Sequence, residues 1–197
     1  MTRAPARYGY TLCVIVVLVV AACRRSPDEV PFRVVDLVRE FDRAEKRPAD
    51  GFQLTAYAAD GVVRPAIVVP VPSRVIWSLP LPRRGRFRAF LALSGRGDPS
   101  AVIRFRFGVS DFRIYEGLAE HTIAAARPGW VDVRTDLSAY AGIKWSLFYR
   151  PDRVTWRVVL ATDVVGGGPA TAVWGSPEIV TDFAGAKEYI TRRHRLR

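Results

Sequence analysis

The chain has 197 residues, which is enough for one domain with short accessory segments. Hydrophobic residues make up 49% of it and charged residues 25%, which are the values of a globular protein and exclude a largely disordered chain. Lys and Arg number 30 against 19 Asp and Glu, but two cysteines and two histidines leave little for a disulfide scaffold or a Cys/His metal site. We therefore expect no metal and no cofactor.

The first 22 residues predict a secretory signal peptide. Arg3 and Arg7 make the start positively charged, and residues 12–23 are all apolar, small or Cys. This run is shorter than the roughly 20 residues that a transmembrane helix needs. It has the length of the apolar region of a signal peptide instead.

Residues 20–23, Val-Ala-Ala-Cys, resemble the lipobox of bacterial lipoproteins. The resemblance implies cleavage before Cys23, acylation of that residue and a stable lipid anchor in the membrane. Arg24 follows Cys23 where Asp would favour the inner membrane, so we expect a cell-envelope protein, in the outer membrane if the host is Gram-negative. Cleavage would also remove Cys13, which excludes cysteine catalysis. The alternative is an ordinary secretory signal cleaved near Ala22.

The mature chain divides into a tether, a domain and a tail. Residues 23–31 are a short lipidated tether, residues 32–180 the folded domain, and residues 181–197 a basic C-terminal tail that is either a short helix or a frayed end. The domain opens with a predicted helix over residues 32–46, because apolar residues recur there at helical spacing. These residues are Val34, Leu37, Val38 and Phe41.

From Phe52 onward the pattern changes to a period of two, in which alternate residues of each run are apolar. The alternating runs are residues 75–79, 87–93, 103–109, 143–149 and 154–160. Such alternation is typical of antiparallel sheets with one solvated face, and turn residues separate the runs. We expect a mainly β protein, an antiparallel sandwich or barrel, in which the proline-rich stretch 65–82 is an edge.

The segment from Trp130 to Pro177 carries a family resemblance. Its motif is Trp130, Asp136-Leu137-Ser138, Ala141-Gly142 and Trp174-Gly175-Ser176-Pro177. It resembles the jelly-roll β-sandwich of galactose-binding-like and carbohydrate-binding-module-like domains, as found before the catalytic region of some sulfatase-like proteins. The resemblance covers residues 89–180 and implies a jelly-roll-like antiparallel sandwich. The short predicted N-terminal helix would precede this sandwich in the chain. It carries over no enzyme, because the chain ends at Arg197 without the hydrolase region.

Candidate catalytic groups are few. His194 lies in the basic tail, and His121 lies with Glu116 and Glu120 in a predicted loop, where a solvated cluster is a simpler interpretation than a metal site. The chain has no G-x-S-x-G, phosphate-binding loop or H-E-x-x-H motif. We therefore expect no enzyme.

Carbohydrate binding is one expected function. Sugar rings stack on exposed aromatic side chains, but Trp77, Trp145 and Trp156 occupy apolar phases of the strands and are predicted core residues. Asparagine is absent and Gln53 is the one glutamine, which weakens the carbohydrate hypothesis.

Arg88, Arg104 and Arg106 form the charge-based alternative. They lie on the polar phase of neighbouring runs, beside Arg83, Arg84 and Arg86, and would make one guanidinium face if the strands paired. Guanidinium groups suit phosphate and carboxylate oxygens. The partner would be anionic lipid, an anionic polysaccharide or an acidic envelope protein, and not nucleic acid, which does not fit the compartment. The alternative without a function is that these arginines form a solvated face in an arginine-rich chain.

Overall, the sequence predicts a membrane-anchored envelope lipoprotein that acts as a non-catalytic binding or scaffolding module. Its ligand is carbohydrate in the family-based interpretation. In the charge-based alternative it binds an anionic surface, or docks a partner protein, through the arginine-rich sheet face.

Overall fold

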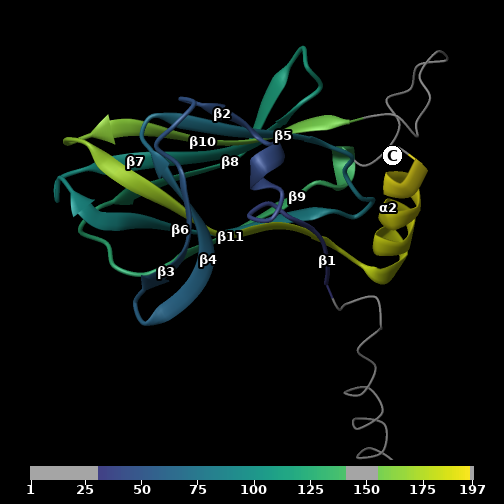
Figure 1. Ribbon diagram of the computed structural model, residues 1–197, viewed down its shortest axis with the longest axis horizontal. Helices are drawn as coiled ribbons and strands as arrows, with labels where there is room; N and C mark the ends of the chain where they lie inside the picture. Colours follow the sequence, from purple (N-terminus) through teal and green to yellow (C-terminus); the bar gives the residue numbers. More distant parts are fainter. Residues whose placement is uncertain (1–30, 141–154, 196–197) are drawn as a thin grey trace, which may run out of the picture.

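The computed structural model describes residues 31–140 and 155–195. Its strands form two antiparallel sheets that pack face to face (Figure 1). The first, sheet A, has the order β3-β4-β11-β6-β9, with β1 paired to β11. Its strands are β1 (Phe32–Asp36), β3 (Gln53–Ala59), β4 (Val62–Pro70), β6 (Arg86–Gly97), β9 (Val131–Asp136) and β11 (Ala170–Thr181).

The second sheet, sheet B, has the order β2-β5-β10-β7-β8. Its strands are β2 (Glu45–Arg47), β5 (Ser73–Leu79), β7 (Val102–Ser110), β8 (Tyr115–Ala124) and β10 (Trp156–Gly166). One α-helix, α2 (Phe183–Arg195), follows β11 and lies at one end of the sandwich (Figure 1). Two short 3-10 turns, Phe41–Arg43 and Ser138–Tyr140, complete the described elements.

The path of the chain between the sheets is that of a jelly roll. From β4 onward, strands β4, β6, β9 and β11 enter sheet A, and strands β5, β7, β8 and β10 enter sheet B. Each sheet therefore takes its strands from two interleaved Greek keys. The predicted fold class, a mainly β jelly-roll-like sandwich, is confirmed.

The core fills the space between the two sheets with the apolar phase of each strand. The rings of Phe87 in sheet A and Phe107 in sheet B stack with centroids 3.7 Å apart. Trp174 meets Phe87 and Phe105 edge-on and is 1% exposed. Trp77 and Trp156 are buried as predicted, whereas Trp145 lies outside the described residues.

The predicted helix over residues 32–46 is wrong. Residues 32–36 form β1, which pairs antiparallel with β11, and residues 45–47 form β2 at the edge of sheet B. A helical spacing of apolar residues cannot distinguish these two outcomes when an open sheet edge is near, since an edge offers the backbone hydrogen bonds that a helix would make internally. The 3-10 turn at Phe41–Arg43 is the remaining helical piece of this segment.

The C-terminal segment, expected as a basic tail, forms the helix α2. Asp182 starts it, because its Oδ1 accepts a hydrogen bond from the backbone N–H of Gly185 at 2.7 Å. Ala186 and Tyr189, three residues apart, are buried and fix the helix on the domain.

The proline-rich stretch does not lie at an edge. Strand β4 runs between β3 and β11, and β5 runs between β2 and β10. Pro65 is tolerated because β11 pairs with β4 only from Ala66 onward, and Pro70 is the last residue of its strand.

The motif behind the family resemblance plays mainly structural roles. Asp136 Oδ1 accepts hydrogen bonds from the N–H and the hydroxyl of Ser138, which closes the predicted turn after β9. Pro177 does not end strand pairing, because β11 bulges there and pairs with β6 again at Glu178. Ala141 and Gly142 lie outside the described residues.

Candidate ligand-binding site

The structure separates the three predicted ligand-binding arginines. Arg88 lies on β6 in sheet A, whereas Arg104 and Arg106 lie on β7 in sheet B. Strands β6 and β7 do not pair, because the chain crosses to the opposite sheet between them. The prediction that the three share one face through strand pairing is therefore wrong, although each lies on the polar phase of its strand.

Each of these arginines has an acidic neighbour on its own face. Arg88 lies 3.8 Å from Glu178, and its guanidinium is 5.2 Å from the ring centre of Phe90. Arg104 lies 3.6 Å from Glu120, and Arg106 forms an ion pair with Asp163.

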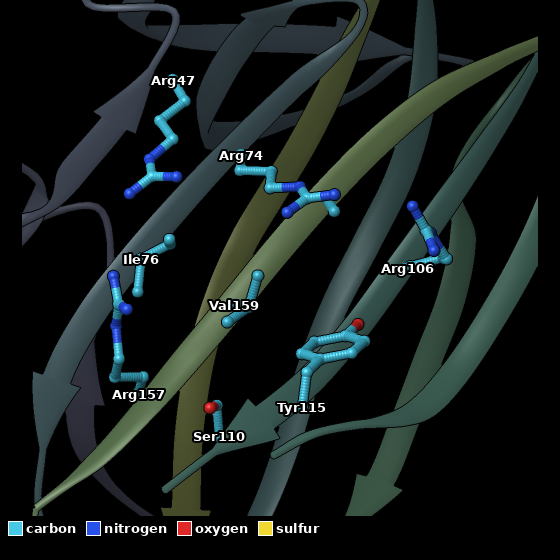
Figure 2. A pocket seen from close by; sticks show the side chains of 9 residues that line it. Arg47, Arg74, Ile76, Arg106, Ser110, Tyr115, Arg157 and Val159 are labelled. Carbon is cyan, nitrogen blue, oxygen red and sulfur yellow. The ribbon is translucent and has the colours of Figure 1, made fainter. Parts of the chain in front are cut away.

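A pocket of about 240 Å³ opens on the outer face of sheet B and includes Arg106 (Figure 2). It draws its lining from strands β2, β5, β7, β8 and β10. The lining residues are Arg47, Arg74, Ile76, Arg106, Ser110, Tyr115, Arg157, Val159 and Ala161. We call it the arginine pocket.

Strand register builds the floor of the arginine pocket. Val159 on β10 lies opposite Ile76 on one side and Gly108 on the other, and Ala161 lies opposite Arg74 and Arg106. Ile76, Val159 and Ala161 form an apolar cluster apart from the main core, and each is less than 9% exposed. This apolar floor lies on the outer face of the sheet, and the long arginine side chains around it cover it.

Gly108 makes room for one wall of the pocket. A Cβ atom at this position would lie 2.6 Å from the hydroxyl oxygen of Tyr115 and 2.7 Å from its ring. The Tyr115 ring can therefore lie against the backbone of β7, with its hydroxyl end turned toward Arg106 (Figure 2).

Burial raises the pKa of Tyr115, although the charges of Arg106 and Arg74 act in the opposite direction. The phenol therefore stays neutral at pH 7 and can donate a hydrogen bond into the pocket.

The pocket carries more positive than negative charge. Glu45 binds both Arg47 and Arg157, and Asp163 binds Arg106. Arg74 is exposed and makes no hydrogen bond or ion pair with any described residue. Glu45 and Asp163 thus bind three of the four guanidinium groups, and Arg74 is the one that is free to meet a ligand.

Two further features extend the site. The Nε of Arg106 is buried without a hydrogen-bond partner among the described residues. A wider hollow of about 560 Å³ shares Arg47 and Arg74 with the arginine pocket and is also lined by Pro70, Pro72 and Ser73. Asp163 lines this hollow too, so it extends the space beside Arg47 and Arg74 without adding another arginine.

Sequence reasoning found Arg106 but missed Arg47, Arg74, Arg157 and Tyr115. Arg74 and Arg157 do occupy the polar phase of their strands, so the alternation already predicted that both face away from the core. What it lacked was the order of strands in sheet B.

The other predicted positions lie away from this site or outside the described residues. His121 lies on strand β8, opposite Phe105, and not in a loop, and His194 is exposed on α2. Within residues 31–140 and 155–195, no group of three or more His, Cys, Asp or Glu could hold a metal. Cys23 is outside the described residues. No helix in the described part of the chain is both long and apolar enough to cross a bilayer.

No protein family matches the sequence, and no curated protein is significantly similar to it. Solved structures of carbohydrate-binding modules are similar to parts of this chain. A CBM51 module of Clostridium perfringens GH95, in complex with methyl-galactose, is 15% identical with a TM-score of 0.45, over 75% of this chain and 99% of that one. The CBM22-1 xylan-binding domain of Paenibacillus barcinonensis Xyn10C is 14% identical with a TM-score of 0.45, over 70% and 85% of the two chains.

A similarity also extends to part of a larger protein. The M60 catalytic domain of Clostridium perfringens ZmpB with its CBM51-1 and CBM51-2 domains is 14% identical, with a TM-score of 0.44. The match covers 66% of this chain and 12% of that one. These similarities concern the path of the backbone and say nothing of the arginine pocket.

Proposed function

We propose that this protein is a lipid-anchored, non-catalytic binding module of the cell envelope, and that its arginine pocket holds an acidic saccharide. The observation that carries the ligand class is the combination of an apolar floor with unbalanced guanidinium charge. The anchor rests on the lipobox-like residues 20–23 and on Cys23.

The floor and wall of the pocket suit the C–H face of a sugar ring. Ile76, Val159 and Ala161 line the floor of the pocket beneath the arginine side chains, and Tyr115 adds an aromatic ring beside them. Sugar rings combine an apolar face with polar edges, so such a ligand would bury its face and leave its edges to the arginines.

The rim suits a carboxylate or sulfate on that sugar. Planar guanidinium groups bind such anions through paired hydrogen bonds, which are about twice as strong as neutral ones. Arg74 needs no rearrangement to do so, since it has no partner among the described residues. A concave pocket also fits a saccharide better than a flat bilayer surface, so we place membrane contact elsewhere on the molecule.

Removing the free arginine tests this function. We expect Arg74→Ala to weaken binding of trigalacturonate by about 10-fold or more, because a hydrogen bond to a charged group contributes about 1.5–3 kcal/mol. Folding should be unaffected, since no ion pair is lost. Isothermal titration calorimetry at 50 mM salt measures the effect.

Two controls sharpen the result. Arg127→Ala removes another exposed arginine, in the turn between β8 and β9, whose side chain has no ion pair with a described residue, and this variant should bind as the wild type does. The methyl ester of trigalacturonate has the same skeleton without charge and should bind weakly. Equal affinity for ester and acid, or equal losses in the two variants, would contradict the proposal.

A further inference from the structure

Helix α2 exposes an apolar stripe on the side that faces away from the domain. Phe183 and Ile190 are 58% and 54% exposed, and they lie seven residues apart, which places them on one face. Lys187 and His194 are exposed on the same stripe. Large apolar side chains on the outer face of a short terminal helix have no role in the core.

The helix is held firmly in this orientation. Tyr189 on its inner side is 3% exposed. Arg193 donates a hydrogen bond to Glu40 at 2.5 Å, and Arg84 donates one to Asp182, just before the helix, at 2.6 Å. The exposed stripe is therefore a fixed surface of the domain.

Phe32, the first residue of β1, joins this surface. Its ring meets that of Phe183 edge-on with centroids 5.7 Å apart, and its side chain is also exposed. Strand β1 and helix α2 lie side by side at one end of the sandwich (Figure 1). We call Phe32, Phe183 and Ile190 the apolar end.

The predicted lipid lies close to the apolar end along the chain. Phe32 is nine positions after Cys23 in the sequence. Because a fully extended chain spans at most about 3.6 Å per residue, the two residues lie no more than roughly 30 Å apart. A membrane that holds the lipid is therefore within reach of this surface whatever path the tether takes.

Charge at this end fits an anionic bilayer. Lys187 lies between Phe183 and Ile190 on the exposed stripe. The sequence ends in Arg-Arg-His-Arg-Leu-Arg, of which Arg193 is already paired with Glu40. Basic and apolar side chains together are the composition of helices that lie in the membrane interface.

We propose that the apolar end is a membrane-contacting surface, which inserts Phe32, Phe183 and Ile190 into the headgroup region of an anionic bilayer beside the lipid. This inference rests on the proposed lipid anchor but not on the arginine pocket. This contact would hold the tethered domain in one orientation, with the end of the sandwich on the membrane. The arginine pocket, on the face of sheet B, remains open to its ligand.

Spin labels test the contact. The natural lipoprotein carrying Ile190→Cys is labelled and placed in nanodiscs of phosphatidylcholine with 30% phosphatidylglycerol. The matched control is Val63→Cys, which is 64% exposed on β4 away from α2 (Figure 1). We expect the label at position 190 to collide several-fold more with oxygen than with a water-soluble nickel complex, at a depth of about 5–10 Å. The label at position 63 should remain fully accessible to nickel.

The double variant Phe183→Glu/Ile190→Glu should still float with vesicles through its lipid. A label at position 187 should lie in the headgroup region in the natural protein, but in the double variant it should be accessible to nickel. Equal nickel accessibility at positions 190 and 63 in protein that floats would overturn the membrane surface and leave the anchor intact. Shielding of position 190 without lipid would show self-association instead and would also overturn it. Failure of the natural protein to float would overturn the anchor, and the surface with it.

Discussion

Gly108 and Gly117 lie opposite each other in the register of β7 and β8, but their surroundings differ. A Cβ at Gly108 would clash with the backbone carbonyl oxygen of Glu116 and lie 2.6 Å from the Tyr115 hydroxyl, whereas at Gly117 it would lie 3.8 Å from the same ring. The second distance is an ordinary contact and the first is a clash. The pair therefore offers a test in which one methyl group is added on either side of one tyrosine.

We predict that Gly108→Ala displaces Tyr115 and lowers the free energy of unfolding by about 1–3 kcal/mol, as forced overpacking does. It should also weaken trigalacturonate binding, because Tyr115 is a wall of the arginine pocket. Gly117→Ala should fold and bind normally. Urea denaturation and calorimetry measure both effects, and a Gly108→Ala protein with unchanged affinity would remove Tyr115 from the site.

The sequence correctly predicted which side chains face the core and which face solvent wherever a strand shows period-two alternation. Phe87, Phe107 and Trp156 lie in the core as expected, and Arg88, Arg104 and Arg106 lie on the polar phase. The error at the site came from assuming that strands adjacent in sequence pair with each other. In a jelly roll the chain usually crosses to the other sheet instead, so proximity along the sequence says little about proximity on a face.

At the scale of elements, Glu40 links the segment after β1 to helix α2. Its carboxylate accepts hydrogen bonds from Arg193 at 2.5 Å and Arg43 at 2.8 Å. Burial alone would raise the pKa of Glu40, but these two arginines outweigh it, and the pKa lies below its ordinary value. A carboxyl with a depressed pKa stabilises the fold above its unfolded pKa of about 4.3, and that stability is lost as the pH falls through the folded value.

We predict that Glu40→Gln lowers the free energy of unfolding by about 0.5–1 kcal/mol at pH 7, the usual range for a partly exposed ion pair. The difference from the wild type should shrink steadily between about pH 5 and pH 3, because the wild-type carboxyl then becomes neutral as well. Chemical denaturation across this range measures it, with Glu120→Gln, at the more exposed Arg104 pair, as control. A difference that is constant with pH would contradict the role given to Glu40.

One element was predicted wrongly and one was left open, for the same reason. Residues 32–36 become a strand because β11 offers a free edge, and residues 183–195 become a helix because Ala186 and Tyr189 find a surface to cover. Both outcomes depend on tertiary contacts that a local pattern does not contain. The strands of the central sheets were predictable because alternation over several residues leaves few other choices.

At the scale of the whole molecule, the two proposed surfaces serve different purposes. The arginine pocket opens on the face of sheet B, while the apolar end lies where β1 and α2 meet. A domain attached through its end can keep the faces of its sheets clear of the membrane. Net charge favours both contacts, since the chain carries a formal charge of +11 and both partners are anionic.

The measurement that tests the central claim most directly is the location of an acidic sugar on the domain. Trigalacturonate titrated into isotope-labelled protein should shift the backbone resonances of β5, β7 and β10 around Arg74, Arg106 and Val159, and the shifts should disappear at high salt because screening weakens the charge contacts. The methyl ester should shift these resonances much less at the same concentration. Shifts confined to sheet A or to α2, or no shifts at low salt, would contradict the account.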